Sequence, residues 1–114
     1  MKITNQTKNT VLAAHAAVAD RLFKRIKGLL GKKGLGEGEA LIIRPCNSIH
    51  TFFMRFPIDV IFVNRQNKVI KVIPFLRPFC LTSVHFTSAF VIELPSGTIQ
   101  SSSTTAGDTL YLEP

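Results

Sequence analysis

The sequence contains few tryptophan, tyrosine or cysteine residues. It contains no tryptophan, one tyrosine and only two cysteines, Cys46 and Cys80. Two cysteines are too few for a scaffold built from disulfides, so we expect reduced thiols, although a bridge between the two stays open. Acidic residues are also scarce, with seven against fourteen basic residues and a net charge of +7. The chain must therefore fold by burying apolar side chains.

Long hydrophobic runs are missing as well. No stretch of about 18 uninterrupted apolar residues exists, and the first residues include no apolar segment of signal-peptide length. The sequence therefore predicts a cytoplasmic protein. Hydrophobic residues nevertheless make up 46% of the 114 residues, and nine of them are phenylalanines. This length and composition predict one globular domain, residues 1–114, around a single core.

The positive charge is concentrated in one window, residues 21–33. This window contains no acid and six basic residues: Arg21, Lys24, Arg25, Lys27, Lys32 and Lys33. A patch of this kind attracts phosphate groups, an anionic lipid surface or an acidic protein partner. A solvated helix face that only keeps the protein soluble explains the same pattern.

One amphipathic helix is predicted at residues 21–30, with Asp20 as its N-cap. Its apolar side chains recur with the period of a helix: Leu22, Phe23, Ile26, Leu29 and Leu30. The glycine-rich residues 31–38 follow as a loop. This loop lacks the Gly-Lys-Ser/Thr ending and the preceding strand of a Walker phosphate-binding loop. The glycines therefore indicate a connection and not a nucleotide site.

The rest of the chain has the pattern of β-strands. Short β-branched and aromatic runs, separated by Pro, Asn, Gly or Ser, lie at residues 40–43, 48–54, 58–63, 69–75, 89–94 and 109–112. Residues 2–5 and 10–19 are expected to supply one or two more. Residues 64–68 read as a hairpin loop in which Asn67 takes a positive φ. Strands of this number and spacing predict a barrel or a sandwich.

Residues 46–59 combine a thiol, an imidazole, a guanidinium and a carboxylate with large apolar side chains. Cys46 and His50 are spaced like zinc ligands, but on a strand their α-carbons would lie about 13 Å apart. The same separation prevents His50 from activating Cys46 as a nucleophile, while a pairing with Cys80 stays open. As a central strand covered on both sides, residues 48–54 would place His50 and Arg55 on opposite faces. We therefore predict no metal site, no catalytic residue and no cofactor.

Two carboxylates, Asp59 and Glu93, stand within apolar strands, where an unpaired charge is costly. Arg44, Arg55 and Arg77 are the available partners, so a structural network of carboxylates and arginines is one interpretation. A binding pocket is the other, because polar groups set among apolar strands are its usual lining.

Four motifs between residues 25 and 112 together form a pattern that is typical of one family. They are Arg25-x-x-Gly28-Leu29-Leu30, Cys46-x-Ser48-Ile49-His50-Thr51-Phe52-Phe53-Met54-x-x-x-Ile58-Asp59-Val60-x-Phe62, Val91-x-Glu93-Leu94-x-x-Gly97 and Gly107-Asp108. In these motifs the chain resembles the uncharacterised ancient conserved region called domain of unknown function 192. The resemblance implies a compact, β-rich, barrel-like domain with a short helix near its start, and it implies no reaction. We therefore expect a barrel-like domain of about six to eight short strands with one amphipathic helix near the N-terminus.

The leading functional hypothesis is a non-enzymatic binding module. Its pocket, at the mouth of the barrel, would receive a small anionic ligand or a peptide end and would be lined by His50, Arg55, Asp59, Arg77 and Glu93. Binding of a protein partner through a phenylalanine-rich surface belongs to the same hypothesis.

Two alternatives remain open. One is a thiol- or carboxylate-dependent enzyme. The other is electrostatic binding of nucleic acid or a membrane surface by the basic helix and the glycine-lysine loop. Nucleic acid is disfavoured, because Phe23, on the apolar face, is the one aromatic residue among those charges and cannot stack on bases.

Overall fold

The computed structural model describes residues 1–19, 35–52 and 54–114. These residues form eight strands and one helix: β1 (Lys2–Asn5), β2 (Thr10–Ala13), β3 (His15–Ala19), β4 (Glu39–Ile43), β5 (Ile58–Val63), β6 (Val69–Leu76), β7 (Phe90–Pro95), α2 (Thr98–Ser102) and β8 (Leu110–Glu113). The secondary structure is mainly β, as the sequence predicts.

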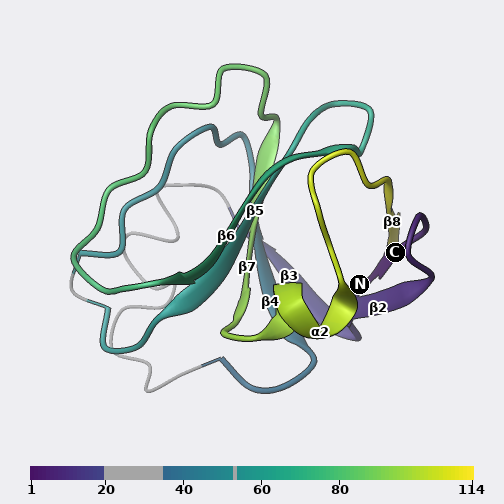
Figure 1. The fold of residues 1–114 in the computed structure, drawn as a ribbon, viewed down its shortest axis with the longest axis horizontal. Coiled ribbons are helices and arrows are strands. Elements are labelled where there is room, and N and C mark those ends of the chain that lie inside the picture. Colours follow the sequence, from purple (N-terminus) through teal and green to yellow (C-terminus); the bar gives the residue numbers. More distant parts are fainter. Residues whose placement is uncertain (20–34, 53) are drawn as a thin grey trace.

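The strands form two sheets (Figure 1). The larger has five strands in the order β3-β4-β7-β5-β6, and the smaller has three in the order β2-β1-β8. The pairing of β3 with β4 is parallel, and the other pairings are antiparallel. The smaller sheet and α2 lie on one side of the larger sheet, at the right in Figure 1, while long loops lie on the other side. The five-stranded sheet is therefore the central layer.

This central layer separates two hydrophobic clusters. On β5, Ile61 and Val63 belong to the cluster that includes residues of the smaller sheet and α2, whereas Val60 and Phe62 belong to the cluster on the loop side. Successive strand residues point to opposite faces, so β5 supplies both clusters. All six of its residues are buried. Cover on both faces explains why the strand is an almost continuous apolar run.

The prediction of a barrel is wrong. In the part of the chain that the structure describes, β3 and β6 are the two edges of the five-stranded sheet and do not pair with each other. The apolar runs that suggest closure are instead covered by the smaller sheet on one face and by loops on the other. A layered sandwich buries the same strands without closing the sheet.

The predicted position of the helix is also corrected. The helix of the described residues, α2, lies near the C-terminus and not near the N-terminus. Its sequence is polar and buries only Ile99 and Ser102, too few positions to produce a helical hydrophobic period. The helix predicted at residues 21–30 lies outside the described residues.

A strand at residues 48–54 does not form. The described residues of this segment belong to a loop with one isolated bridge, between His50 and Leu81. The segment alternates like a strand because Ile49 and Thr51 are buried while His50 and Phe52 are more exposed. The hairpin loop at residues 64–68 is confirmed, with φ of 60° at Asn67.

Candidate functional site

Two loops cover the outer face of the central layer, and we call residues 44–52, 54–57 and 77–89 the loop layer. Buried side chains of the first loop, Cys46, Ile49 and Met54, pack with Phe62 in the loop-side cluster. The loops are joined to each other by a pair of hydrogen bonds. The Ile49 N–H donates to the Thr82 hydroxyl at 3.0 Å, and the Thr82 N–H donates to the Ile49 carbonyl at 3.0 Å.

Thr51 makes the central connection between the two loops. Its hydroxyl donates to the Arg77 carbonyl at 2.6 Å and accepts from the Cys80 N–H at 2.9 Å. Its own N–H donates to the Cys80 carbonyl at 2.8 Å, and its carbonyl accepts from the Phe79 N–H at 2.9 Å. Thr51 is fully buried. These bonds hold the two loops in one register and fix which side chains point outward.

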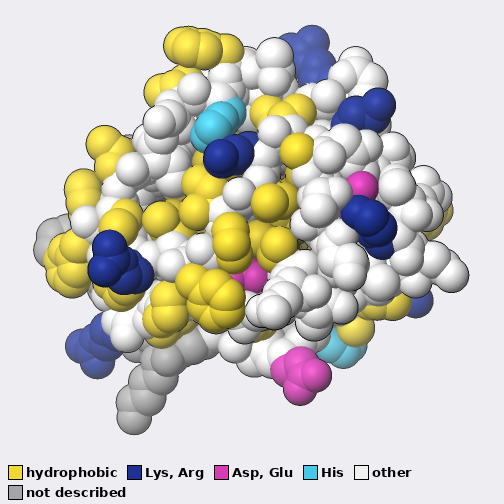
Figure 2. Space-filling model, in the orientation of Figure 1, with side chains coloured by type: hydrophobic (Ala, Val, Ile, Leu, Met, Phe, Trp, Pro, Cys, Tyr) yellow, Lys and Arg dark blue, Asp and Glu magenta, His cyan; other side chains and the backbone are white. Residues whose placement is uncertain are grey.

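Large apolar side chains project from the outer surface of the loop layer. Phe86 is 87% exposed, Leu81 70% and Phe79 65%. Further exposed side chains of this kind are Phe52, Val84 and, at the end of β6, Phe75. Figure 2 shows hydrophobic side chains along the left and upper margin of the molecule, where Figure 1 places the loop at residues 77–89. Large exposed apolar patches are frequent at the binding surfaces of proteins.

Two of these phenylalanines adopt a left-handed backbone conformation. The φ angle is 53° at Phe75 and 61° at Phe79. This conformation costs a residue other than glycine about 1 kcal/mol. Hydrogen bonds impose it, because the Phe75 N–H donates to the Asp59 carboxylate and the Phe79 N–H donates to the Thr51 carbonyl. Backbone strain beside exposed aromatic side chains is typical of a functional site.

The same surface is cationic. Residues 40–92 contain one acid, Asp59, and its side chain is buried. Of the exposed basic residues in this span, Arg44, Arg55 and Arg77 belong to the loop layer, and Arg65 borders a hollow together with Phe86 of the loop layer. The Arg44 guanidinium lies over the Phe90 ring, and the others, Lys68 and Lys71, lie near and on β6. The outer surface of the loop layer therefore combines apolar groups and positive charge with no acidic side chain. This combination is complementary to an anionic partner.

An open hollow of about 630 Å³ lies where the loop layer meets the β5–β6 hairpin. Phe86 and Arg65 both line it, together with polar side chains that include Asn64, Gln66 and Ser88. An exposed aromatic ring and a guanidinium thus border one concavity. Such a pair suits a ligand that has an anionic part and an apolar part.

Three of the predicted ligand residues, His50, Arg55 and Arg77, belong to the loop layer. Arg55 and Arg77 are exposed, and His50 is half-buried. The His50 Nδ1 accepts a hydrogen bond from the Phe52 N–H at 3.3 Å. The imidazole also stacks on the Phe52 ring, with 4.9 Å between the ring centroids. Ligand binding by these three side chains stays a prediction.

The other two predicted residues, Asp59 and Glu93, are fully buried and point to opposite faces of the central layer. Asp59 pairs with Leu94 across β5 and β7, whereas Glu93 pairs with Val60. Because paired residues share a face, Asp59 lies on the side of α2 and Glu93 on the side of the loop layer. The five predicted residues therefore do not line one pocket together.

Asp59 fixes two segments to β5. Its Oδ2 accepts from the N–H groups of Gly97 at 3.1 Å and Ile99 at 2.7 Å, at the start of α2. Its Oδ1 accepts from the Phe75 N–H at 2.9 Å. A carboxylate in this position satisfies N–H groups that have no partner within the helix. Sequence reasoning identified Asp59 as needing partners but named arginines, whereas the donors are backbone groups.

The two cysteines are thiols and are not bridged. Cys46 is buried, and its thiol donates to the Ser48 carbonyl at 3.1 Å. Cys80 is partly exposed. A buried thiol is poorly placed to act as a nucleophile. Among the described residues, no three His, Cys, Asp or Glu side chains form a group that could hold a metal ion.

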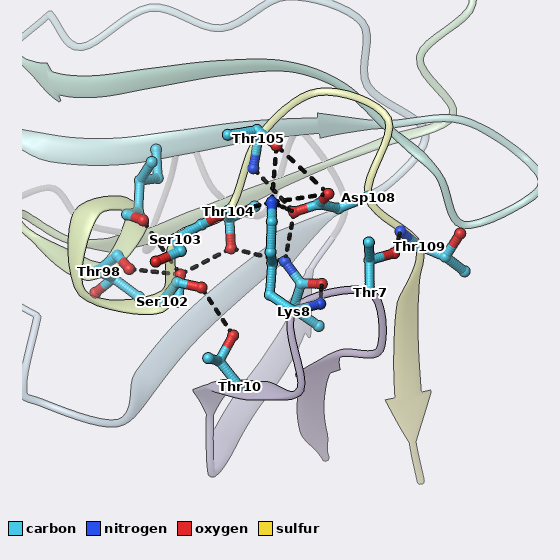
Figure 3. Close-up of polar contacts among 12 residues, drawn as sticks. Thr7, Lys8, Thr10, Thr98, Ser102, Ser103, Thr104, Thr105, Asp108 and Thr109 are labelled. Atoms are coloured by element: carbon cyan, nitrogen blue, oxygen red, sulfur yellow. Dashed lines mark hydrogen bonds and ion pairs between the residues drawn. The ribbon is translucent and has the colours of Figure 1, made fainter.

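A separate polar cluster joins the two ends of the chain (Figure 3). The Lys8 ammonium donates to both Asp108 oxygens, at 3.1 and 2.9 Å, and the Asn5 amide donates at 2.9 Å. The Thr105 N–H donates to the same carboxylate at 3.0 Å. Burial by itself raises the pKa of Asp108, but these hydrogen bonds and the Lys8 charge outweigh burial and lower the pKa to about 2. This arrangement explains the Gly107-Asp108 motif as structural.

Comparison with known proteins identifies the family. The model of the DUF192 family, described as "Uncharacterized ACR", matches residues 3–112. The chain belongs to this family.

Curated relatives are UPF0127 proteins. One from Pyrococcus horikoshii is 32% identical over 111 residues, which cover 93% of this chain and 94% of the relative. One from Thermococcus sibiricus is 30% identical over 115 residues, which cover 97% of this chain and 74% of the relative. The DUF192 family is uncharacterised, so membership assigns no reaction.

Two solved structures resemble this DUF192 protein in fold. One is a protein of unknown function from Novosphingobium aromaticivorans, with a TM-score of 0.78, 19% identity and coverage of 97% of this chain and 82% of the other. The second, from Sinorhizobium meliloti 1021 and provisionally described as a transcription regulator, has a TM-score of 0.79, 15% identity and coverage of 96% and 89%. At these identities the likeness concerns the fold alone.

The predicted basic patch, Arg21, Lys24, Arg25, Lys27, Lys32 and Lys33, lies outside the described residues. In the ranges 1–19, 35–52 and 54–114, no helix has the length and apolar character needed to cross a bilayer. The loop layer is therefore the candidate site that the described residues define.

Proposed function

We propose that this DUF192 protein is a non-enzymatic binding module whose binding surface is the loop layer. One observation carries the proposal: residues 44–52, 54–57 and 77–89 expose large apolar side chains and guanidinium groups and include no acidic residue. Such a surface binds a partner that presents both negative charge and apolar groups. Apolar burial supplies affinity, and the charges supply orientation and a fast association rate.

Within this surface, Arg55 and Arg77 are the residues that would bind the anionic group of the partner. A guanidinium can donate two parallel hydrogen bonds to a carboxylate or a phosphate. The backbone of His50 lies close to that of Arg77, because the hydroxyl of Thr51, the next residue along the chain, donates a hydrogen bond to the Arg77 carbonyl. Glu93 lies beneath the loop layer, and Asp59 faces the other way. The proposal therefore retains His50, Arg55 and Arg77 as contact residues.

The test is an NMR titration of the ¹⁵N-labelled protein with a synthetic peptide in which glutamate alternates with phenylalanine. The same peptide with lysine in place of glutamate is the control. We expect amide shifts in the loop layer and none in β1, β2 or β8, and only with the acidic peptide. The double variant Arg55→Gln/Arg77→Gln should bind about tenfold more weakly, because each exposed charge pair contributes up to about 1 kcal/mol.

Lys2→Gln is the matched charge control, because Lys2 is exposed on the smaller sheet. This variant should bind the acidic peptide as the parent does. Equal weakening by Lys2→Gln and by the arginine variant would mean that net charge alone drives binding. Absence of loop-layer shifts with the acidic peptide and with anionic vesicles would refute the proposed function.

A further inference from the structure

We infer that the partner of the loop layer is the surface of an anionic lipid bilayer, and that the side chains of Leu81 and Phe86 insert into it. This inference rests on the proposed function and specifies the class of partner. It does not rest on the basic residues 21–33, which lie outside the described residues.

The shape of the surface favours a bilayer over a folded protein. The apolar side chains protrude from the loop layer, with Phe86 87% exposed and Leu81 70% exposed. The hollow that Phe86 borders is open, and its other lining residues include Arg65 and the polar residues Asn64, Gln66, Thr87 and Ser88. A folded partner must offer a shaped pocket for each protruding side chain. The boundary between headgroups and acyl chains accepts such side chains without a preformed pocket.

The charges around these side chains match an anionic surface. Arg65 lies at one end of the loop layer, where it shares a hollow with Phe86, and Arg55 and Arg77 lie on the two loops. When Phe86 inserts, Arg65 is placed at the level of the lipid phosphates. Each Arg or Lys near an anionic membrane surface contributes about 1 kcal/mol of attraction. No acidic side chain between residues 60 and 92 opposes this attraction.

The binding test uses the full chain with phosphatidylcholine vesicles, prepared with and without phosphatidylserine. We expect co-sedimentation only with the phosphatidylserine vesicles, decreasing as salt rises. Leu81→Ser/Phe86→Ser should weaken binding at least tenfold, because burying such a side chain contributes about 1.5–3 kcal/mol. Arg65→Gln should weaken it about fivefold, which corresponds to one charge at the surface.

Matched controls come from the opposite side of the molecule. Val11 and Tyr111 are also exposed apolar residues, but they lie on β2 and β8 of the smaller sheet. Val11→Ser/Tyr111→Ser should therefore bind anionic vesicles as tightly as the parent. Equal weakening by both double variants would overturn the inference, as would unchanged binding of Leu81→Ser/Phe86→Ser.

The absence of tryptophan from the chain permits a direct measure of insertion. Phe86→Trp introduces a single tryptophan at the proposed depth, and Tyr111→Trp introduces one on the opposite side. With anionic vesicles, the Phe86→Trp emission should shift to shorter wavelength and be quenched by brominated acyl chains, while the Tyr111→Trp emission should not change. An unshifted Phe86→Trp spectrum on vesicle-bound protein would overturn the insertion.

The two proposals fail in distinguishable ways. Loop-layer shifts with the acidic peptide and no binding to anionic vesicles would overturn the bilayer inference and leave the proposed function standing. Vesicle binding that is unchanged in Leu81→Ser/Phe86→Ser would assign membrane affinity to another part of the chain and also overturn the inference. Failure of both probes would overturn both proposals.

Discussion

At Asp59, one carboxylate accepts hydrogen bonds from three backbone N–H groups that lie 16, 38 and 40 residues away in the sequence. Asp59→Ala leaves these donors without an acceptor, in a site from which water is excluded. We expect the free energy of unfolding to fall by at least about 3 kcal/mol, measured by urea denaturation. Asp59→Asn should cost less, because its amide oxygen still accepts while its NH₂ group faces a donor. An unchanged urea midpoint for Asp59→Ala would show that the carboxylate does not fix α2.

Because of Asp108, the free energy of unfolding depends on pH in the acidic range. Its pKa is about 2 in the folded protein against an ordinary value of 3.8. A lowered pKa means that the folded state favours the charged form, so the stabilisation is complete above about pH 4 and is lost as the pH falls through about 2. The difference corresponds to about 1–2 kcal/mol once solvent screening around the partly exposed Lys8 is allowed for.

The comparison of parent and Asp108→Asn isolates this contribution. Denaturant midpoints measured from about pH 5 down to about pH 2 should fall more steeply for the parent, and the two stabilities should converge at the acidic end. Parallel curves for the two proteins would contradict the role assigned to Asp108. Lys8→Met should reduce the same pH dependence, because Lys8 supplies part of the interaction.

For single residues, the sequence identified buried groups better than it identified their partners. Asp59 and Glu93 were expected to need partners because they stand in apolar strands, and both are fully buried. The partners of Asp59 are backbone groups on β6 and at α2, and no residue-type pattern marks a backbone donor. The side to which each carboxylate points follows from the pairing of β5 with β7. Of the five residues predicted to line one pocket, Asp59 and Glu93 therefore lie on opposite faces of the central sheet.

At the scale of elements, the loop layer is held by side chains and not by a regular sheet. Thr51→Val keeps the shape of the side chain and removes the bonds of its hydroxyl to the Arg77 carbonyl and the Cys80 N–H. We expect amide hydrogen exchange to accelerate in residues 49–52 and 77–82, with exchange in β5 and β7 unchanged. The reason is that the layer opens locally while the central sheet stays folded.

A matched variant shows whether the faster exchange comes from losing the hydrogen bonds of Thr51 or from replacing any threonine of the loop layer by valine. Thr87 also belongs to the loop layer, in the loop at residues 77–89, but it is exposed, so Thr87→Val is the matched variant. This variant should leave the exchange pattern of the parent unchanged. Uniformly faster exchange across β5 and β7 in Thr51→Val would mean that the loops and the central sheet unfold together.

The strands of the central sheet could be predicted from the sequence. Residues 48–54 and α2 could not, because the conformation of each depends on contacts with distant segments of the chain. The strands at residues 58–63, 69–75 and 89–94 were expected within one residue of β5, β6 and β7. Residues 48–54 have the composition of a strand, yet their neighbours are the loop residues 79–82 and not a sheet. α2 was missed because it buries only two side chains and its N-terminus is capped by Asp59, from a distant strand. Local pattern does not contain that information.

At the scale of the whole molecule, the two faces of the central sheet have different covers. The smaller sheet and α2 cover one face of the central sheet, and the Lys8–Asp108 cluster joins the two ends of the chain on that side. The loop layer covers the other face and presents the apolar and cationic surface. The bilayer inference belongs to this scale, because it requires one side of the molecule to differ from the other.

The sequence by itself determined that this chain is a mainly β domain of the DUF192 family, that it is strongly cationic, and where most of its strands lie. These properties follow from composition, from alternation along the chain and from motifs, all of which are local. Only the tertiary structure decided that the sheet stays open, that Asp59 and Glu93 face opposite ways, and that Leu81 and Phe86 point outward. These features depend on hydrogen bonds and strand register between segments that are far apart in the sequence, such as β5 with β7 and Ile49 with Thr82, 33 residues along the chain.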